Sequence, residues 1–279
     1  MDWWVWPVAL LAVTFAMGIV AVLAGVGGGV LFVPLVGVLL PFHLDFVRAA
    51  GLLLALTASL SAAPALLRSG LASVRLALPL TLVSSVTSIA GALLGLALPT
   101  DKLQIALGLI VLGIAALMWR RRGSEHPVVA RADPLGVALG MHGVYHDRSL
   151  GRDVPWQVQR TPAGFVAFAG IGVIAGMFGL GAGWANVPAL NLLMGVPLKL
   201  AVGTSGFLLI GGASSASWIY LERGAVLPLL VVPSIIGAML GAKLGVRLLH
   251  ATRPAVVRRV VLVLLVLAGA RALLKGFGI

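Results

Sequence analysis

The chain reads Gly25-Val26-Gly27-Gly28-Gly29-Val30-Leu31-Phe32-Val33-Pro34 in the middle of an apolar run that extends from Trp3 to about Phe42. That run is too long for one transmembrane helix of about 20 residues. Each glycine lowers helix propensity by about 1 kcal/mol relative to alanine, so this cluster predicts a break. We therefore expect two helical segments here, near 5–24 and 29–41.

A second glycine stretch shows that the chain is built from a repeat. It reads Gly179-Leu180-Gly181-Ala182-Gly183-Trp184-Ala185-Asn186-Val187-Pro188, about 154 residues after the first. At this offset Gly27, Gly29, Val33, Pro34 and Gly70 match Gly181, Gly183, Val187, Pro188 and Gly224; after a deletion of about eight residues, Ser88, Gly91 and Gly95 match Ser234, Gly237 and Gly241. This ordered series predicts an internal repeat.

Composition places the chain in a membrane. Of 279 residues 60% are hydrophobic and 10% charged, with a mean hydropathy of +1.11, which excludes an ordinary soluble domain. We expect an all-α integral membrane protein forming a single membrane domain over 1–279, with repeat 1 at about 4–119, a polar loop at about 120–160 and repeat 2 at about 161–279. The other eight helical segments are expected near 49–67, 76–98, 103–119, 163–179, 185–195, 200–220, 225–249 and 257–274. The chain has no cysteine, which excludes disulfides and thiolate chemistry.

The distribution of Lys and Arg predicts the orientation. If all ten segments cross, about thirteen of these residues, seven of them arginines of 120–160, lie on one side and about five on the other. The richer side should be cytoplasmic, which places the central loop inside and both termini outside the cell membrane. An odd number of spans per repeat makes the two repeats inverted, as in many secondary transporters. If 29–41 and 185–195 are re-entrant instead, this bias weakens. The net charge of +12 is thus explained without nucleic acid.

The glycine motifs are the candidate ligand site. A glycine break frees backbone groups that need polar partners in the membrane. Amides at the start of a half-helix carry partial positive charge and can hold an anion. We expect the two breaks to converge on one ligand and be stiffened by Pro34 and Pro188; the backbone ligands are Gly27, Gly28, Gly29, Gly181 and Gly183. The alternative is that these glycines only permit close helix packing. The lysine of a phosphate-binding P-loop is absent.

The doubled motif ending in Val-Pro resembles the sulfite exporter TauE/SafE family, also called TSUP transporters, over nearly the whole chain. Ala201-Val202-Gly203-Thr204-Ser205, Ser214-Ser215 and Tyr220 ahead of Gly224 add to the resemblance. Ala49-Ala50-Gly51-Leu52 departs from the Thr-Ser usual in the family, and Ala182 replaces a glycine. The resemblance implies a transporter, and an exporter, of a small sulfur-containing anion such as sulfite or an organosulfonate. A transporter or channel for another small anion, such as a carboxylate, sulfate or thiosulfate, stays open.

Polar side chains near the motifs are candidate substrate ligands. Hydroxyls of Thr57 and Ser59 in one repeat, and of Thr204 and Ser205 in the other, can donate to anion oxygens. The further hydroxyls are Ser61, Ser214, Ser215 and Ser217. Bonding to their own helix carbonyls is the alternative. Asn186 is a further candidate because a buried amide needs partners.

Few charges lie at membrane depth. Lys243 and Arg247 can steer an anion or extend to lipid phosphate. Asp45 and Arg48 are expected to flank the segment at 49–67 and to pair with each other.

Other function classes fit the residues less well. An enzyme needs a buried nucleophile, metal or acid–base pair, and the sequence shows none. His126, His142 and His146 with Asp147 resemble a metal cluster, but Val144 to Val158 is typical of a small hairpin with a polar turn. We expect no cofactor and no metal. The expected partners are a small anion and membrane lipid, and a homodimer stays open.

Overall fold

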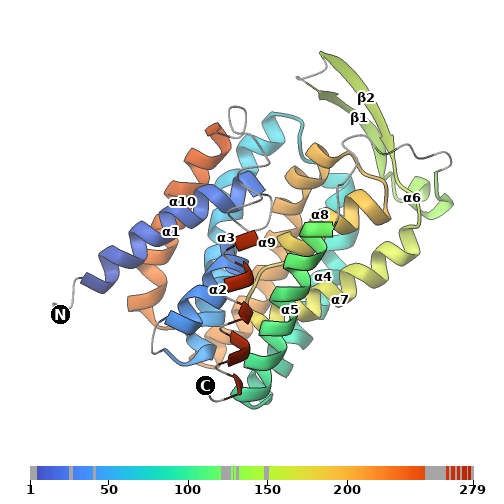
Figure 1. Cartoon of the computed structure of the whole chain (residues 1–279). Helices are drawn as coiled ribbons and strands as arrows, with labels where there is room; N and C mark the ends of the chain where they lie inside the picture. Colours follow the sequence, from blue (N-terminus) through green and yellow to red (C-terminus); the bar gives the residue numbers. More distant parts are fainter. Residues whose placement is uncertain are drawn as a thin grey trace.

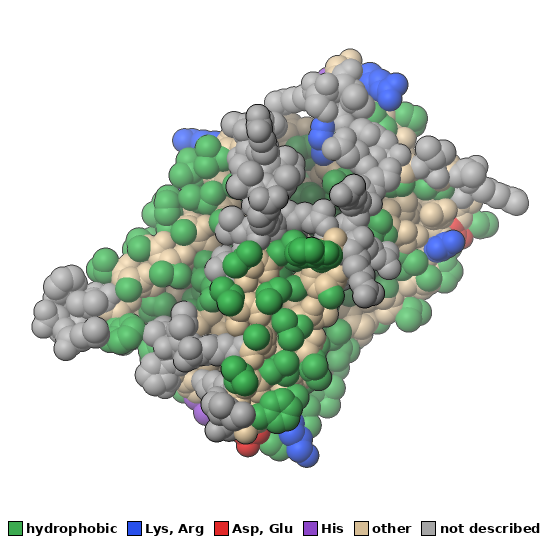
Figure 2. Space-filling model, viewed as in Figure 1, with side chains coloured by type: hydrophobic (Ala, Val, Ile, Leu, Met, Phe, Trp, Pro, Cys, Tyr) green, Lys and Arg blue, Asp and Glu red, His purple; other side chains and the backbone are tan. Residues whose placement is uncertain are grey.

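The computed structural model describes residues 5–24, 28–39, 42–120, 127, 129, 132–147 and 151–248, and all of 262–277 except 264, 268, 271 and 275. Helices dominate this part of the chain, and six of them are long and apolar enough to cross a membrane (Figure 1). Hydrophobic side chains cover much of the described surface in Figure 2, and charged side chains lie mainly toward its ends. The predicted all-α membrane fold is confirmed.

The expected segments all have helical counterparts. The predicted first repeat contains α1 (Val5–Ala24), α2 (Gly28–Leu39), α3 (Leu44–Arg68), α4 (Val74–Ala97) and α5 (Thr100–Arg120). The second contains α7 (Thr161–Phe178), α8 (Gly183–Pro188) with the π-helix η1 (Ala189–Leu193), α9 (Leu198–Glu222) and α10 (Pro228–Leu248). Helical residues between 262 and 276 match the tenth segment.

One predicted boundary is wrong. We expected Asp45 and Arg48 to precede the third helix, but α3 begins at Leu44 and contains both. Nδ1 of His43 accepts a 3.4 Å hydrogen bond from the Asp45 amide and caps the helix. An aspartate in the first turn also favours the positive end of the helix dipole, which explains the earlier start.

The helices pair reciprocally between the two halves. α1 packs on α10 and α4 on α7, with α3 and α9 packed together between these pairs (Figure 1). The first helix of each half thus packs on the fourth helix of the other half. Glycines that match in sequence permit both contacts: a Cβ at Gly91 would lie 2.1 Å from the Val173 carbonyl oxygen, and one at Gly237 2.3 Å from that of Leu11. This exchange of partners supports the predicted repeat, whose inversion across the membrane stays a prediction.

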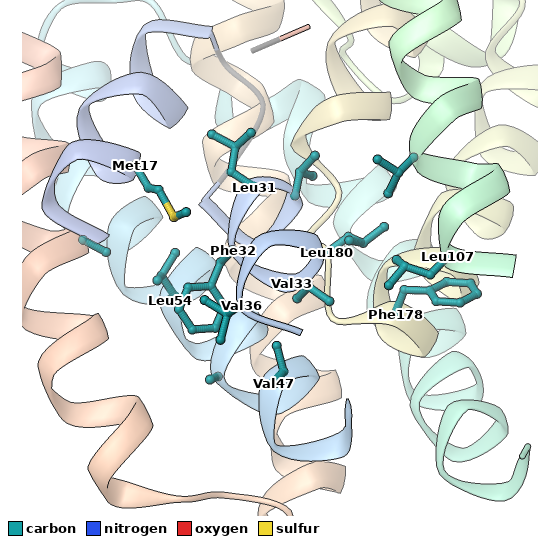
Figure 3. Packing of buried hydrophobic residues seen from close by; sticks show 14 of the residues in the cluster. Met17, Leu31, Phe32, Val33, Val36, Val47, Leu54, Leu107, Phe178 and Leu180 are labelled. Carbon is teal, nitrogen blue, oxygen red and sulfur yellow. The ribbon is translucent and has the colours of Figure 1, made fainter. Parts of the chain in front are cut away.

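The short helix α2 lies in the core of the molecule. Its residues Val30, Leu31, Phe32 and Val33 are all buried. Figure 3 shows Phe32 and Val36 on the side of Leu54, and Phe178 and Leu180 toward Leu107 of α5, within one cluster. A helix that is apolar on every face is stable only when surrounded, so the chain around α2 fixes its position.

A small sheet occupies the polar stretch in which a hairpin is predicted. β1 (His142–Asp147) pairs antiparallel with β2 (Arg152–Gln157), with Val144 opposite Pro155. It projects from the helices beside the short α6 (Pro134–Ala138) (Figure 1). The Asp133 carboxylate accepts hydrogen bonds from the amides of Leu135 (3.2 Å) and Thr161 (2.7 Å), which joins α6 to the start of α7.

Candidate functional site

The two glycine motifs meet in the structure. A Cβ on Gly29 would lie 2.7 Å from the carbonyl oxygen of Leu180 and 2.8 Å from that of Gly179, so the start of α2 touches the chain between α7 and α8 directly. Gly179 and Gly181 have φ of +67° and +66°, a left-handed conformation that side chains rarely adopt. The break after α7 therefore requires glycine at both positions, and the sequence supplies it.

A cavity lies beside this junction. It measures about 50 Å³ and is bounded by α1, α3, α9 and the first residue of α2. The lining residues are Ala21, Val22, Gly28, Ala58, Ser59, Ala62, Leu66, Val202, Ser205, Gly206 and Leu209. Three predicted site residues, Gly28, Ser59 and Ser205, are thus brought together from three separate helices.

Ser205 carries the clearest polar group in the cavity wall. Its side chain is 1% exposed, and among the residues that the structure describes its Oγ has no hydrogen-bond partner. Leaving a buried hydroxyl unpaired costs about 1–3 kcal/mol, so such a group indicates a bound water or ligand. Ser59 on α3 is 7% exposed and lines the same cavity.

Other predicted hydroxyls are already engaged. Thr57 Oγ1 donates to the carbonyl oxygens of Leu53 (2.8 Å) and Leu54 (3.2 Å) of its own helix. Thr204 Oγ1 accepts a 3.1 Å hydrogen bond from the Ser73 amide. Ser61 and Ser214 likewise donate to carbonyls one turn earlier. Three of these hydroxyls bond within their own helix and that of Thr204 links α9 to the turn before α4, and none of the four residues lines the cavity.

The remaining predicted residues lie around the junction. Gly181 sits between α3 and α9, and Gly183 is the buried first residue of α8. Asn186 is buried in α8, and its Nδ2 has no partner among the described residues. Pro34 lies inside α2; Pro188 ends α8, and the π-helix η1 follows at once. Gly27 lies outside the described residues.

The basic pair on α10 lies level with the cavity. Lys243 and Arg247 are both exposed. Between them, a Cβ on Gly245 would lie 3.1 Å from Cβ of Val22, which lines the cavity.

Arg48 is the main residue that the sequence analysis placed wrongly. Its side chain is 1% exposed and forms an ion pair with Asp45. Nη1 donates to the carbonyl oxygens of Gly95 (2.9 Å) and Met177 (3.0 Å), and Cζ lies 5.8 Å from the centre of the Tyr220 ring. The predicted pairing of Asp45 with Arg48 is thus confirmed, and their spacing of three residues is that of an ion pair within a helix.

Comparison with known proteins decides the family. The family model described as "Sulfite exporter TauE/SafE" matches residues 10–272. The chain belongs to the TauE/SafE family. It is also 28% identical over 148 residues to "Probable membrane transporter protein YunE" of Bacillus subtilis (strain 168), a match covering 53% of this chain and 54% of that protein. The chain thus spans about half the length of the curated relative that it matches.

No solved structure shows significant similarity to this TauE/SafE chain. The resemblance predicted from the two glycine motifs is confirmed. Both matched descriptions are of transporters and neither is of an enzyme.

Proposed function

We propose that the chain is a secondary transporter that exports a small sulfur-containing anion, such as sulfite or an organosulfonate, and binds it in the cavity beside the glycine junction. One observation carries the proposal: the cavity combines the first residue of α2 with the buried hydroxyls of Ser59 and Ser205. Membership of the TauE/SafE family supports transport, and the description of that family as sulfite exporters supports sulfite as a substrate.

The cavity suits an anion without a charged side chain. None of the described lining residues carries a full charge. The start of α2, at Gly28, presents partial positive charge from its free amides. Fixed amide dipoles and hydroxyls have a far smaller desolvation cost than a buried arginine when the site is empty. Release of the ligand is therefore easier, as transport requires.

The size of the cavity supports a small ligand. Its 50 Å³ is well below the roughly 300–1,000 Å³ typical of pockets for drug-sized molecules. At about 10–15 Å³ per water-sized group, it holds roughly three to five such groups. An ion with a sulfur atom and three oxygens belongs to this size class.

The charges near the cavity support delivery of an anion. Lys243 and Arg247 are exposed on the turn of α10 that packs beside Val22 in the cavity wall. Exposed positive charge near a site raises the local concentration of anions and the association rate. We assign these two residues a steering role, with the central loop and this end of the molecule on the cytoplasmic side.

A ligand screen tests the proposal. The purified protein is heated with sulfite, sulfate, thiosulfate, a sulfonate or a carboxylate, because a ligand that binds the folded state raises its apparent stability. Sulfite or the sulfonate should stabilise the protein and should move across proteoliposomes. Ser205→Ala should weaken binding about five-fold or more through loss of one hydrogen bond. Ser214→Ala, which removes an exposed hydroxyl bonded to its own helix, is the matched control.

The outcomes separate the parts of the proposal. Stabilisation by carboxylates alone would contradict the proposal that the substrate contains sulfur, but it would still support an anion-binding site in the cavity. Equal binding by the Ser205→Ala protein and the parent would place the site elsewhere. Current through single proteins, instead of slow exchange, would identify a channel.

A further inference from the structure

The helices that border the cavity carry matched stripes that continue past it. On α3 the stripe is Arg48, Leu52, Ala55 and Ser59; on α9 it is Ser205, Leu209, Ala213, Ala216 and Tyr220. Steps of three and four residues place each set on one helix face. Because α3 and α9 are antiparallel neighbours, each stripe starts at the cavity and ends in the Arg48–Tyr220 pair. Arg48 lies eleven residues before Ser59, or roughly 16 Å along the helix.

Apolar residues occupy the space between the cavity and Arg48. A Cβ on Gly181 would lie 3.1 Å from both Ala55 Cβ and Leu209 Cδ2, so the second glycine break is inserted between the two stripes. Beyond it Leu52 packs with Ala213 in a separate buried cluster that includes Tyr220. The contacts between the two stripes here are apolar, so the hydrogen bonds and the ion pair of Arg48 supply the polar closure at this end.

Arg48 ties four helix ends together there. It bonds the carbonyl of Gly95 near the end of α4 and that of Met177 near the end of α7, and it lies against Tyr220 of α9. Tyr220 in turn donates its hydroxyl to the carbonyl oxygens of Gly176 (3.1 Å) and Met177 (3.3 Å). A Cβ on Gly179 would lie 2.3 Å from the Arg48 carbonyl oxygen, so the glycine break itself is packed on this residue.

We propose that the Arg48–Asp45–Tyr220 cluster is the gate that closes one end of the transport path, so the structure shows the state in which the cavity opens only toward the opposite end of α3. This assignment rests on the proposed transport function. Nη1 and Nη2 of Arg48 are paired with two carbonyls and one carboxylate, while its buried Nε has no partner among the described residues. A buried arginine has a large desolvation cost unless its donors are paired, so these bonds hold the cluster closed, and water that enters on opening can replace them.

The absence of cysteine in the chain makes the gate directly testable. Ser205→Cys introduces a single thiol in the cavity wall. A membrane-impermeant thiol reagent is then applied to vesicles of either orientation. The thiol should react quickly from the side of Arg68, where α3 ends, and slowly from the side of Asp45. Adding Arg48→Gln should raise the slow rate about ten-fold, because several hydrogen bonds to a charged group are lost.

Two further variants keep the test decisive. Asp45→Asn releases Arg48 from its ion pair at a half-buried position and should also raise the slow rate, so it decides the question if the Arg48→Gln protein does not reach the membrane. Arg68→Gln makes the same change at the exposed other end of α3 and should change neither rate.

Three results would overturn the gate: equal reaction from both sides in the Ser205→Cys protein, no reaction of that protein from either side, or an unchanged slow rate after both Arg48→Gln and Asp45→Asn are added to it. Labelling needs no substrate. If the Ser205→Cys protein shows the expected labelling while the parent chain, with Ser205 in place, moves no anion, only the proposed function is therefore contradicted.

Discussion

Gly181 lies between α3 and α9, two residues after Gly179, which contacts the first glycine motif at Gly29. Its φ is +66°, and a Cβ there would meet Ala55 and Leu209 at 3.1 Å. An alanine in the left-handed region costs about 1–2 kcal/mol before any contact is counted. A single methyl group at this residue is therefore expected to disturb both the backbone and the path beside the cavity.

Gly181→Ala should lower the free energy of unfolding by about 1–2 kcal/mol and weaken stabilisation by the bound anion, because the break must shift away from the cavity wall. Thermal unfolding in detergent, with and without sulfite, measures both effects. Gly113→Ala is the control, since a Cβ on this α5 residue meets nothing within 4 Å and should leave stability unchanged or slightly raised. An unchanged Gly181→Ala protein would show that this glycine is dispensable.

The candidate hydroxyls show which features of the site could be predicted from the sequence. Thr57 and Ser59 are two residues apart on α3, and Thr204 and Ser205 are adjacent on α9. Composition and spacing therefore cannot show which residue of each pair is the better candidate ligand. The rotation of each helix against its neighbours separates them. Thr204 bonds to Ser73, 131 residues away in the sequence, while Ser205 faces the cavity. The residue types were predictable, but their division into structural and cavity-facing groups depends on tertiary packing.

The burial of the charged Arg48 side chain could likewise not be predicted from the sequence. In the sequence it stands at the edge of an apolar run, where a basic residue normally belongs to a loop. Its burial depends on carbonyls of α4 and α7 and on Tyr220, which lie 47 to 172 residues further along the chain. Asp45, one turn earlier, is the one partner that the local sequence predicts; the distant partners have no local sequence signal.

At the scale of elements, hydropathy and glycine position predicted most boundaries. The glycine stretch after Phe178 separates α7 from α8, because glycines lower helix propensity and give a helix no side chains to pack. The other predicted break falls on residues 25–27, which lie outside the described residues. The π-helix after Pro188 was not predictable. Proline removes one amide donor, but whether the following turn widens depends on what it packs against.

The reciprocal pairing of helices predicts that equivalent substitutions at the two contacts lower stability by similar amounts. Gly91→Ala on α4 and Gly237→Ala on α10 each place a methyl group against a backbone carbonyl, of Val173 on α7 and of Leu11 on α1. Overpacking of this kind costs about 1–3 kcal/mol, so both proteins should unfold at a lower temperature by similar amounts. Thermal unfolding of the purified variants measures this effect.

Gly170→Ala serves as the control for this pair, because a Cβ on that residue of α7 meets no atom within 4 Å. A loss of stability in one variant of the pair only would mean that the two contacts are not equivalent, and the repeat in packing would be wrong.

At the scale of the whole molecule, contacts between loops define one common end. The Gln159 amide donates to the Met194 carbonyl oxygen (3.0 Å), and the Ser73 amide donates to Thr204 at the start of α9. The central loop, the turn between α3 and α4 and the turn before α9 therefore lie together. Exposed basic residues at this end include Arg68, Arg75, Arg160 and Lys199. The charge bias counted along the sequence is thus also a bias between the two ends of the folded molecule.

That bias predicts the orientation in the cell. Positively charged ends remain on the cytoplasmic side, so the end carrying the β1–β2 hairpin should face the cytoplasm, with both termini outside. Reporter fusions measure this directly. An enzyme active only outside the cell should be inactive when fused after Gly123 and active when fused after Ile279, and a reporter that works only in the cytoplasm should show the reverse. Activity of the external enzyme after Gly123 would contradict the orientation. It would also place the cavity and the Arg48 gate on the sides opposite to those required for an exporter that loads from the cytoplasm.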